Sequence, residues 1–396
     1  MYNTVSTIHV GTPGLGKDMS GSRKRWRKIA IVAGSFTLIF ALLMLSPYKT
    51  TLLNGLMLEA NAHINDLLKS QDSFLASMPE AINGVTSTDF VPILVSHSED
   101  SDPLDAWFER SQTEALLVQK NGQIVYERYA QDADRGRNIN GMSMAKNIIA
   151  LMIGIAIDEG KIQSENDSVS HYLPEIVITN NEGLTIRDLL RHTSGIQSAS
   201  EDLSATLKGK GLVTPLAEIS FNGDRAFRYD NINYHLLNLI LGRIYKQPLN
   251  RLIEEKLWFP LGLEDAAIIN STGYCCLFAT ARSWLGIGNL YLNESNDVIS
   301  RRWIDKMVTD TLVPNRFFVQ ATGKSEGNSY GYHIYSGLPT LPETFWIEGM
   351  GLQLIMINRK TETIIVRLGG IPSKFNITSN RNEATLIEPL LKVLAQ

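Results

Sequence analysis

Two scarcities limit the chemistry open to this chain. It has only two cysteines in 396 residues, which excludes a disulfide-based scaffold and a cysteine-rich zinc module. They are the neighbours Cys275 and Cys276, and because a disulfide between neighbours is strained, two buried thiols are expected. The seven histidines show neither His-Glu-x-x-His nor His-x-His spacing, so we predict no metal and no other cofactor. His192 is expected to form structural hydrogen bonds, and His333 to pack in a strand.

Acidic residues outnumber basic ones outside the N-terminus. Residues 1–28 contain six Lys or Arg and one Asp, a charge of +5, whereas the other 368 residues carry −9. A body this acidic is a poor binder of polyanions, so no nucleic-acid partner is expected. The hydrophobic share of 44% is too high for a disordered protein, and the length suits one large domain or two average ones.

One long segment lacks charge altogether. The basic cluster Arg23–Lys28 is followed by twenty uncharged residues, 29–48. As a helix these span about 30 Å, the thickness of the hydrocarbon core of a bilayer. Basic flanks stay in the cytoplasm. We therefore predict a cytoplasmic tail (1–28), an uncleaved transmembrane signal anchor (29–48) in the inner membrane and a periplasmic body, with a cleaved signal peptide as the alternative.

Hydrophobic periodicity predicts how the exported part is organised. A helical stalk and linker is expected over residues 49–103, and a globular domain over 104–396. Two pairs of β-rich runs lie near opposite ends of this domain: 115–120 with 123–129, joined by Asn121-Gly122, and 352–358 with 363–368. Helices are expected at 143–159, 184–192, 231–245, 248–257, 279–293 and 380–395. This pattern predicts an α+β fold, in which N- and C-terminal strands form one antiparallel sheet with flanking helices and an inserted helical region.

Ser143 is the candidate nucleophile. It lies three residues before Lys146 at the start of an apolar helical stretch, so the two side chains share a face and can meet. A serine hydroxyl is a weak nucleophile until a base takes its proton, and a lysine in a dry site can be that base. Ser-x-x-Lys alone is a weak signal, since it recurs by chance at Ser46 and Lys49. A solvated lysine at a helix start is the structural alternative.

Tyr229 and Asn231 form a second candidate motif. A phenol beside a lysine can pass a proton to a leaving group, and an amide can hold a substrate carbonyl or the lysine. Tyr-x-Asn also recurs, at Tyr291 and Asn293, so it too is weak in isolation. The structural alternative for Tyr229 is an aromatic side chain packed at a helix entrance.

The order of these motifs resembles that of a known family, the serine β-lactamase-like superfamily. The resemblance is to its class C side: class C β-lactamases, D,D-peptidases, certain esterases and 6-aminohexanoate-dimer hydrolases. It covers about residues 105–395 and implies the fold of this superfamily and an acyl-enzyme mechanism on a small-molecule amide or ester. It implies Ser143 as nucleophile, Lys146 as base, Tyr229 as proton shuttle and Asn231 as the amide of the second motif. The motifs that carry it are Ser143-x-x-Lys146, Thr185–Gly195 with its Leu-Leu-Arg-His-Thr-Ser-Gly run, Tyr229-x-Asn231 and Ala279–Arg282.

The third motif departs from this resemblance. Relatives have a strand with Lys-Thr-Gly or His-x-Gly facing the nucleophile, whereas this chain has Ile347-Glu348-Gly349. The strand can still offer the backbone N–H of Met350 to an oxyanion, together with that of Ser143. Without the cation, β-lactams and peptides with a free C-terminal carboxylate are not the expected substrates. The competing hypothesis is a non-catalytic, membrane-tethered binding or sensor protein on the same fold.

Overall fold

The computed structural model describes residues 80–84, 103–130, 135–174, 183–198, 219–221, 224–270, 272–293, 296–314, 321, 327–370 and 384–396. The predicted cytoplasmic tail (1–28) and signal anchor (29–48) lie outside these residues. Within the described part of the chain, no helix combines the length and the apolar composition needed to cross a membrane.

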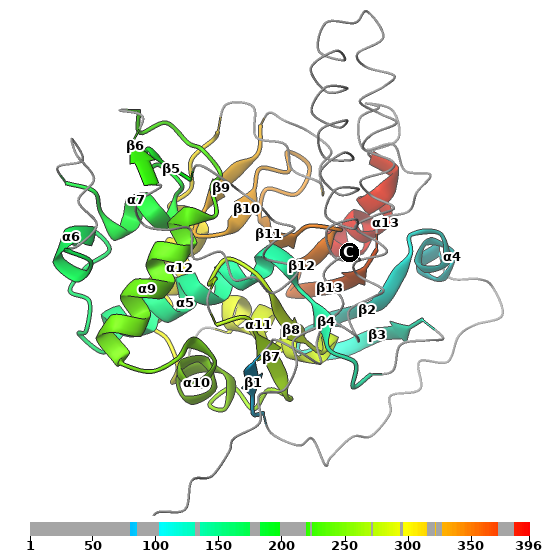
Figure 1. The fold of residues 1–396 in the computed structure, drawn as a ribbon. Coiled ribbons are helices and arrows are strands. Elements are labelled where there is room, and N and C mark those ends of the chain that lie inside the picture. Colours follow the sequence, from blue (N-terminus) through cyan, green and yellow to red (C-terminus); the bar gives the residue numbers. More distant parts are fainter. Residues whose placement is uncertain are drawn as a thin grey trace, which may run out of the picture. The chain divides into compact units, whose positions relative to one another are not determined.

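The largest element is a seven-stranded antiparallel sheet in the order β3-β2-β13-β12-β11-β10-β9. Strand β2 pairs with β13, so both ends of the domain meet in the middle of the sheet, as predicted (Figure 1). Both predicted hairpins are confirmed, β2 with β3 and β12 with β13. The strands are β2 (Thr113–Lys120), β3 (Gln123–Tyr129), β9 (Ser329–Gly331), β10 (Ile334–Ser336), β11 (Thr344–Gly349), β12 (Gln353–Asn358) and β13 (Thr363–Gly369).

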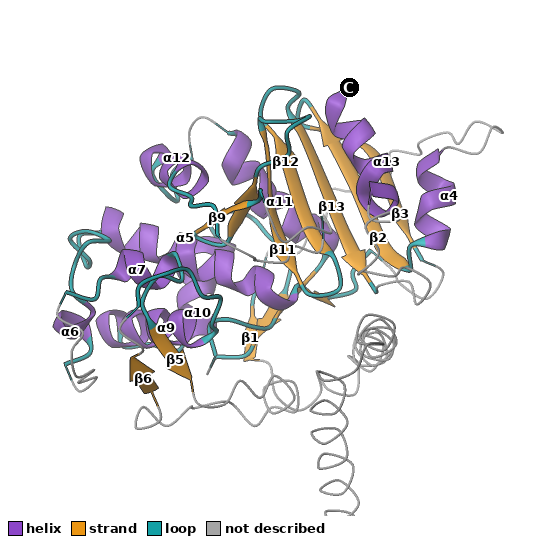
Figure 2. Cartoon of the chain, turned by 90° about the horizontal axis from the view of Figure 1, so that it is seen from above, coloured by secondary structure: helices purple, strands orange, loops and turns teal. Residues whose placement is uncertain are grey.

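Helices cover both faces of this sheet (Figure 2). Helices α4 and α13 pack on one face, where β11 contributes Trp346. The other face packs on α11 and the inserted helical region, and there β11 contributes Phe345 and Ile347. The helices are α4 (Pro103–Arg110), α5 (Ala145–Asp158), α6 (Val169–Tyr172), α7 (Ile186–Leu190), α9 (Ile232–Tyr245), α10 (Leu249–Ile253), the π-helical turn η3 (Glu254–Trp258), α11 (Ala281–Leu292), α12 (Arg301–Thr309) and α13 (Ala384–Ala395).

The predicted linker is wrong in one respect. Residues 80–82, expected between the stalk and the body, form strand β1 (Glu80–Ile82), which pairs with β7. The Ile82 side chain is buried in the core, so this segment belongs to the folded body. Helix α4 begins at Pro103, one residue before the predicted domain start. Strand β1 belongs to a small sheet in the order β1-β7-β8-β4, and β5 pairs with β6. The bounds are β4 (Ile139–Asn140), β5 (Ile196–Ser198), β6 (Ile219–Phe221), β7 (Ala266–Ile268) and β8 (Leu277–Ala279).

A buried arginine ties together the strand ends near β11. The Arg367 guanidinium donates to the carbonyl oxygens of Gly351 (2.6 Å) and Leu352 (3.0 Å) in the β11–β12 turn, and to that of Ser111 (2.8 Å) before β2. Its Nε donates to the Thr113 hydroxyl at 3.1 Å. Burial lowers the pKa of Arg367, although an arginine keeps its proton under ordinary conditions. Backbone carbonyls therefore solvate this charge and fix the turn that follows β11.

Candidate active site

Helix α5 holds the candidate base in the core. Its side chains are apolar almost all round and buried, each fully buried Ile or Leu contributing about 1.5–3 kcal/mol. Ser143 lies just before it, in the 3-10 turn η1 (Met142–Met144). The Lys146 Nζ donates to the Ser143 Oγ at 3.1 Å. Lys146 is 0% exposed, whereas Ser143 is only half-buried, so the hydroxyl is open to a ligand while the amine is enclosed.

The end of strand β11 lies against the turn that carries Ser143. A Cβ atom on Gly349 would lie 2.2 Å from the carbonyl oxygen of Gly141 and 3.2 Å from the Cβ of Met142, so glycine is required there. The Asn140 side-chain oxygen accepts the N–H of Met142 at 2.8 Å, which supports the positive φ of Met142 (52°). These contacts fix the backbone on both sides of the site.

Tyr229 reaches the same place from a distant segment, just before α9. Lys146 Nζ lies 5.0 Å from the centroid of the Tyr229 ring, within the ~6 Å range of a cation–π contact. The imidazole of His192 stacks on this ring, with centroids 4.6 Å apart and planes 23° apart. The structure therefore brings Ser143, Lys146 and Tyr229 together.

Two buried imidazoles lie in the field of Lys146. Burial, and then the charge of Lys146, lower the pKa of His192 and of His333 well below the usual value, so both rings are neutral at neutral pH. The Nδ1 of His192 accepts the N–H of Asp230 at 3.2 Å, as expected for a structural histidine. The Nε2 of His333 donates to the carbonyl of Glu348 at 2.8 Å, which links the β9–β10 turn to β11.

Buried phenols complete the surroundings. The Tyr330 hydroxyl donates to the Nδ1 of His333 at 3.1 Å, because the Nε2 of that ring carries its proton. Burial raises the pKa of Tyr330 and of Tyr335 well above the usual value, and a hydrogen bond with Tyr229 adds to the shift at Tyr335. Tyr330 and Tyr335 therefore stay protonated and neutral at neutral pH.

The third motif presents an aliphatic side chain and a buried acid. Ile347 is fully buried in the core between the sheet and the helices. The Glu348 carboxylate is 6% exposed and accepts from the Trp346 indole N–H (3.0 Å) and the Ala321 N–H (3.2 Å). Glu348 thus holds neighbouring backbone in place, and Met350 follows Gly349 in the turn, half-buried.

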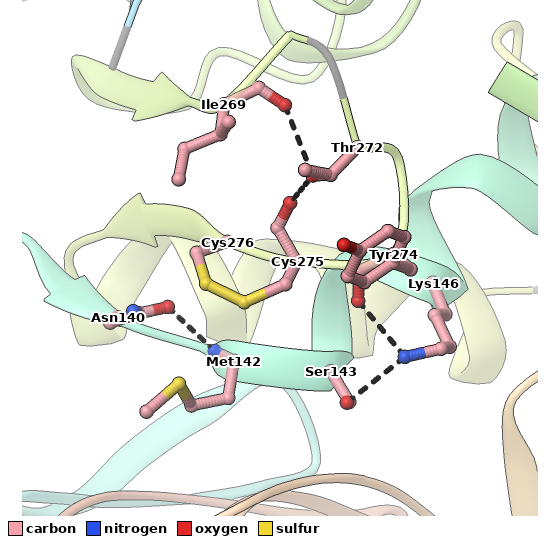
Figure 3. The surroundings of a disulfide bond; sticks show 9 residues. All are labelled: Asn140, Met142, Ser143, Lys146, Ile269, Thr272, Tyr274, Cys275 and Cys276. Atoms are coloured by element: carbon pink, nitrogen blue, oxygen red, sulfur yellow. Dashed lines mark hydrogen bonds between the residues drawn. A yellow bond between two sulfur atoms is a disulfide. The ribbon is translucent and has the colours of Figure 1, made fainter. Parts of the chain in front are cut away.

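The two cysteines correct the sequence-based expectation. Cys275 and Cys276 are joined as a disulfide, where two free thiols were predicted (Figure 3). Both are buried, and the Thr272 hydroxyl donates to the carbonyl of Cys275. The Tyr274 carbonyl, immediately before the pair, accepts from Lys146 Nζ at 3.0 Å, so this segment also positions the amine.

Comparison with known proteins identifies the family. The family model for beta-lactamase matches residues 105–370. The chain belongs to the beta-lactamase family. A protein of Bacillus subtilis named "Putative penicillin-binding protein PbpX" is 28% identical over 165 residues, 38% of this chain and 40% of that protein. Protein flp of Staphylococcus aureus is 32% identical over 165 residues, 37% of this chain and 33% of that protein. The alignments thus span less than half the length of either relative.

Solved structures agree on the fold of this beta-lactamase family member. The "Putative 6-aminohexanoate-dimer hydrolase from Bacillus anthracis" superposes with a TM-score of 0.66 at 18% sequence identity, over 84% of this chain and 93% of that one. At this identity the likeness shows the α+β fold and does not identify a substrate.

Further residues of this beta-lactamase-type site escaped the sequence analysis. Asn231 lies at the N-cap position of α9 and is half-buried. The contacts of His192 and Tyr335 with Tyr229 were not predicted. The only signals for them were the histidine of the Arg-His-Thr-Ser-Gly run and the aromatic run Tyr330–Tyr335, and neither specifies a contact with Tyr229.

Proposed function

We propose that the protein is a membrane-anchored serine hydrolase that cleaves an amide or ester bond through an acyl-enzyme on Ser143. One observation carries this proposal: a half-buried hydroxyl accepts a hydrogen bond from a fully buried amine, and the Tyr229 ring lies 5.0 Å from that amine. Membership of the beta-lactamase family supports the same reaction class.

In the first half of the proposed reaction, the Ser143 Oγ attacks the substrate carbonyl carbon and Lys146 takes the hydroxyl proton. A lysine accepts a proton only in its neutral form, which a site with little water favours. The negative charge on the carbonyl oxygen is stabilised by the N–H groups of Ser143 and Met350. Gly349 supports this assignment, because it lets the end of β11 approach the turn before Ser143.

In the second half, the tetrahedral intermediate expels the leaving group. Tyr229 gives its proton to the departing nitrogen or oxygen and is reprotonated from Lys146, which holds the serine proton. Water then attacks the acyl-enzyme carbonyl, and the same groups run in reverse to release the acid and regenerate Ser143. Asn231, two residues after Tyr229, is proposed to hold a substrate carbonyl or the amine.

The substrate is proposed to be an amide or ester without a free carboxylate beside the scissile bond. Ile347, where relatives carry a cation, is fully buried and cannot pair with an anion. The rings of His192, His333, Tyr330 and Tyr335 are neutral at neutral pH and offer no cation. We therefore expect short acyl esters to be cleaved at least about 100-fold faster than penicillins, in line with the ~10²-fold or larger effects of leaving a polar contact unmade.

The site is proposed to lie on the periplasmic side of the inner membrane. This rests on the basic cluster and the uncharged run of residues 29–48. Protease treatment of spheroplasts tests it: the body should be degraded while a tag on residue 1 stays protected. Degradation of the tag in intact spheroplasts would reverse the orientation.

Active-site labelling tests the hydrolase. The full chain in detergent is incubated with a fluorophosphonate, and the adduct is mapped by mass spectrometry. We expect a label on Ser143 that is lost in Ser143→Ala and in Lys146→Ala. Ser46→Ala is the matched control, because Ser46 and Lys49 repeat the spacing without the site, and labelling should be unchanged.

The same experiment addresses the competing hypothesis of a non-catalytic sensor, which the aliphatic third motif motivates. A folded chain that takes no label and hydrolyses no member of a panel of esters, amide oligomers and peptides would favour the sensor. A Ser143 label without turnover would show that the serine is nucleophilic but that no member of the panel is a substrate.

A further inference from the structure

His192 occupies a position whose backbone is held by its surroundings. It follows α7 in the Arg191–Gly195 segment, is 1% exposed and has a φ of +56°, a left-handed conformation that costs a non-glycine residue about 1–2 kcal/mol. Such a conformation persists where neighbouring contacts determine it. The contacts here lead to another segment, residues 228–230.

One residue holds the backbone on both sides of Tyr229. The carbonyl oxygen of His192 accepts the N–H of Arg228 at 2.8 Å, and its Nδ1 accepts the N–H of Asp230 at 3.2 Å. Between these two hydrogen bonds, the imidazole stacks on the Tyr229 ring at a centroid distance of 4.6 Å. The amide of Asn233, in α9, also lies 3.2 Å from the Nδ1.

The hydrogen bonds fix the state of the ring. A backbone N–H can only donate, so the Nδ1 of His192 is unprotonated and the single proton of the neutral ring is on Nε2. Protonation would remove the acceptor for Asp230 and put a positive charge near Lys146. The described aromatic rings around it include Phe227, Tyr234 and Tyr330, and the Asp230 carboxylate lies 3.8 Å from Arg228 Nε.

We propose that His192 is a positioning residue that holds the Tyr229 ring against Lys146. The inference rests on the proposed function, because the placement of Tyr229 affects turnover only if its phenol transfers a proton. It explains why one residue contributes a stacked ring, an acceptor nitrogen and a carbonyl to three consecutive residues.

Two substitutions separate the contributions of the ring. His192→Phe keeps a stacking ring and loses the acceptor, whereas His192→Asn keeps an acceptor oxygen near the Nδ1 position and loses the ring. In the full chain, each should lower kcat for a p-nitrophenyl ester by about tenfold to 100-fold, the cost of a small misplacement of a reacting group, with KM within about threefold of wild type.

A double-mutant comparison distinguishes positioning from general support of the fold. In a Tyr229→Phe background, either His192 substitution should lower kcat by less than twofold further, because the group it positions is already gone. Equal losses of kcat in both backgrounds, or a change confined to KM, would overturn the proposal. If His192→Phe does not fold, His192→Asn carries the comparison.

A spectroscopic measurement separates this inference from the proposed function. The Tyr229 ring signal in ¹³C-tyrosine NMR spectra is assigned by its loss in Tyr229→Phe, and it should shift in both His192 variants as the stacked imidazole is changed. An unmoved signal would overturn the positioning role of His192 while leaving the labelling of Ser143 intact. If the signal moves in the variants but the wild-type chain shows neither label nor turnover, the proposed hydrolase is refuted. His192 would then position Tyr229 without a catalytic purpose.

Discussion

The start of α5 and the strand ends around Arg367 both bury a basic side chain, but they surround it differently. Arg367 donates to backbone carbonyls at the strand ends and to one hydroxyl. Lys146 donates to the Ser143 hydroxyl and to the Tyr274 carbonyl, beside the Tyr229 ring. An arginine cannot give up its proton, whereas a lysine can. Arg367 therefore holds a turn, whereas Lys146 is placed to exchange a proton with the Ser143 hydroxyl.

Replacing the lysine should have the largest effect on function and little on folding. Lys146→Met keeps the length of the side chain and removes the base, so kcat/KM for a p-nitrophenyl ester should fall by about 10³-fold or more. The melting temperature should change little, since Met keeps the apolar stem, although the Tyr274 carbonyl loses a donor. Lys306→Met, at a half-exposed lysine paired with Glu165, is the control and should keep its activity. Activity within tenfold of wild type would remove Lys146 from the mechanism.

Replacing Arg367 should have a large effect on the stability of the fold. Arg367→Met leaves buried carbonyls of the β11–β12 turn without donors, so the free energy of unfolding should fall by about 3–5 kcal/mol, measured by urea denaturation. Arg367→Lys should recover only part of this, because lysine has fewer donors and no planar fork. A loss below 1 kcal/mol in Arg367→Met would mean that the carbonyls find other partners.

The half-buried ion pair of Arg187 and Asp310 should have an intermediate effect on stability. Burial alone would raise the pKa of Asp310, but hydrogen bonds from Arg187 and Tyr332 and the charge of Arg191 lower it from 3.8 to about 2. Since the folded-state pKa is the lower one, the carboxylate stabilises the fold above about pH 4, and this contribution is lost as the pH falls towards 2. Asp310→Asn should therefore cost about 2 kcal/mol at pH 7, and its difference from wild type should narrow below pH 4. A difference that does not change with pH would assign the effect to packing.

The smallest effect is expected at an exposed pair. Glu388 and Lys392 lie one turn apart on α13, with 47% and 70% of their side chains exposed and 3.1 Å between Oε1 and Nζ. Lys392→Ala should change the free energy of unfolding by about 0.3–0.5 kcal/mol, and 1 M salt should remove the difference. An effect as large as that of Asp310→Asn would show that the exposure of a charged side chain does not determine how much it stabilises the fold.

The sequence predicted the parts of the fold that have long, regular patterns. Both hairpins combine two β-rich runs of six or more residues with a short polar turn, and the apolar stretch of α5 leaves little choice but a buried helix. Strand β1 was missed because it has three residues and pairs with β7, far along the chain, so no local pattern marks it. The same holds for the two residues of β4.

The site could be predicted only in part, because some of its contacts join segments that are far apart in the sequence. Ser143 and Lys146 are three residues apart, so helical geometry alone predicts that they meet. The approach of Tyr229 followed from the resemblance to a family, because no spacing rule connects residues so distant in the chain. The stacking of His192 depends on a left-handed backbone at a non-glycine residue, which has no sequence signature. The bridge between Cys275 and Cys276 was not predicted, because the adjacent cysteines were expected to remain thiols.

The pairing of β2 with β13 makes folding of the sheet depend on the end of the chain. Arg367 and its hydroxyl partner Thr113 are separated by 254 residues, so β2 gains its second neighbour only when the C-terminal strands are present. Closing so long a loop is slow, and the apolar face that packs on α11 stays open meanwhile. A chain that ends before residue 363 should therefore expose unpaired strands and aggregate.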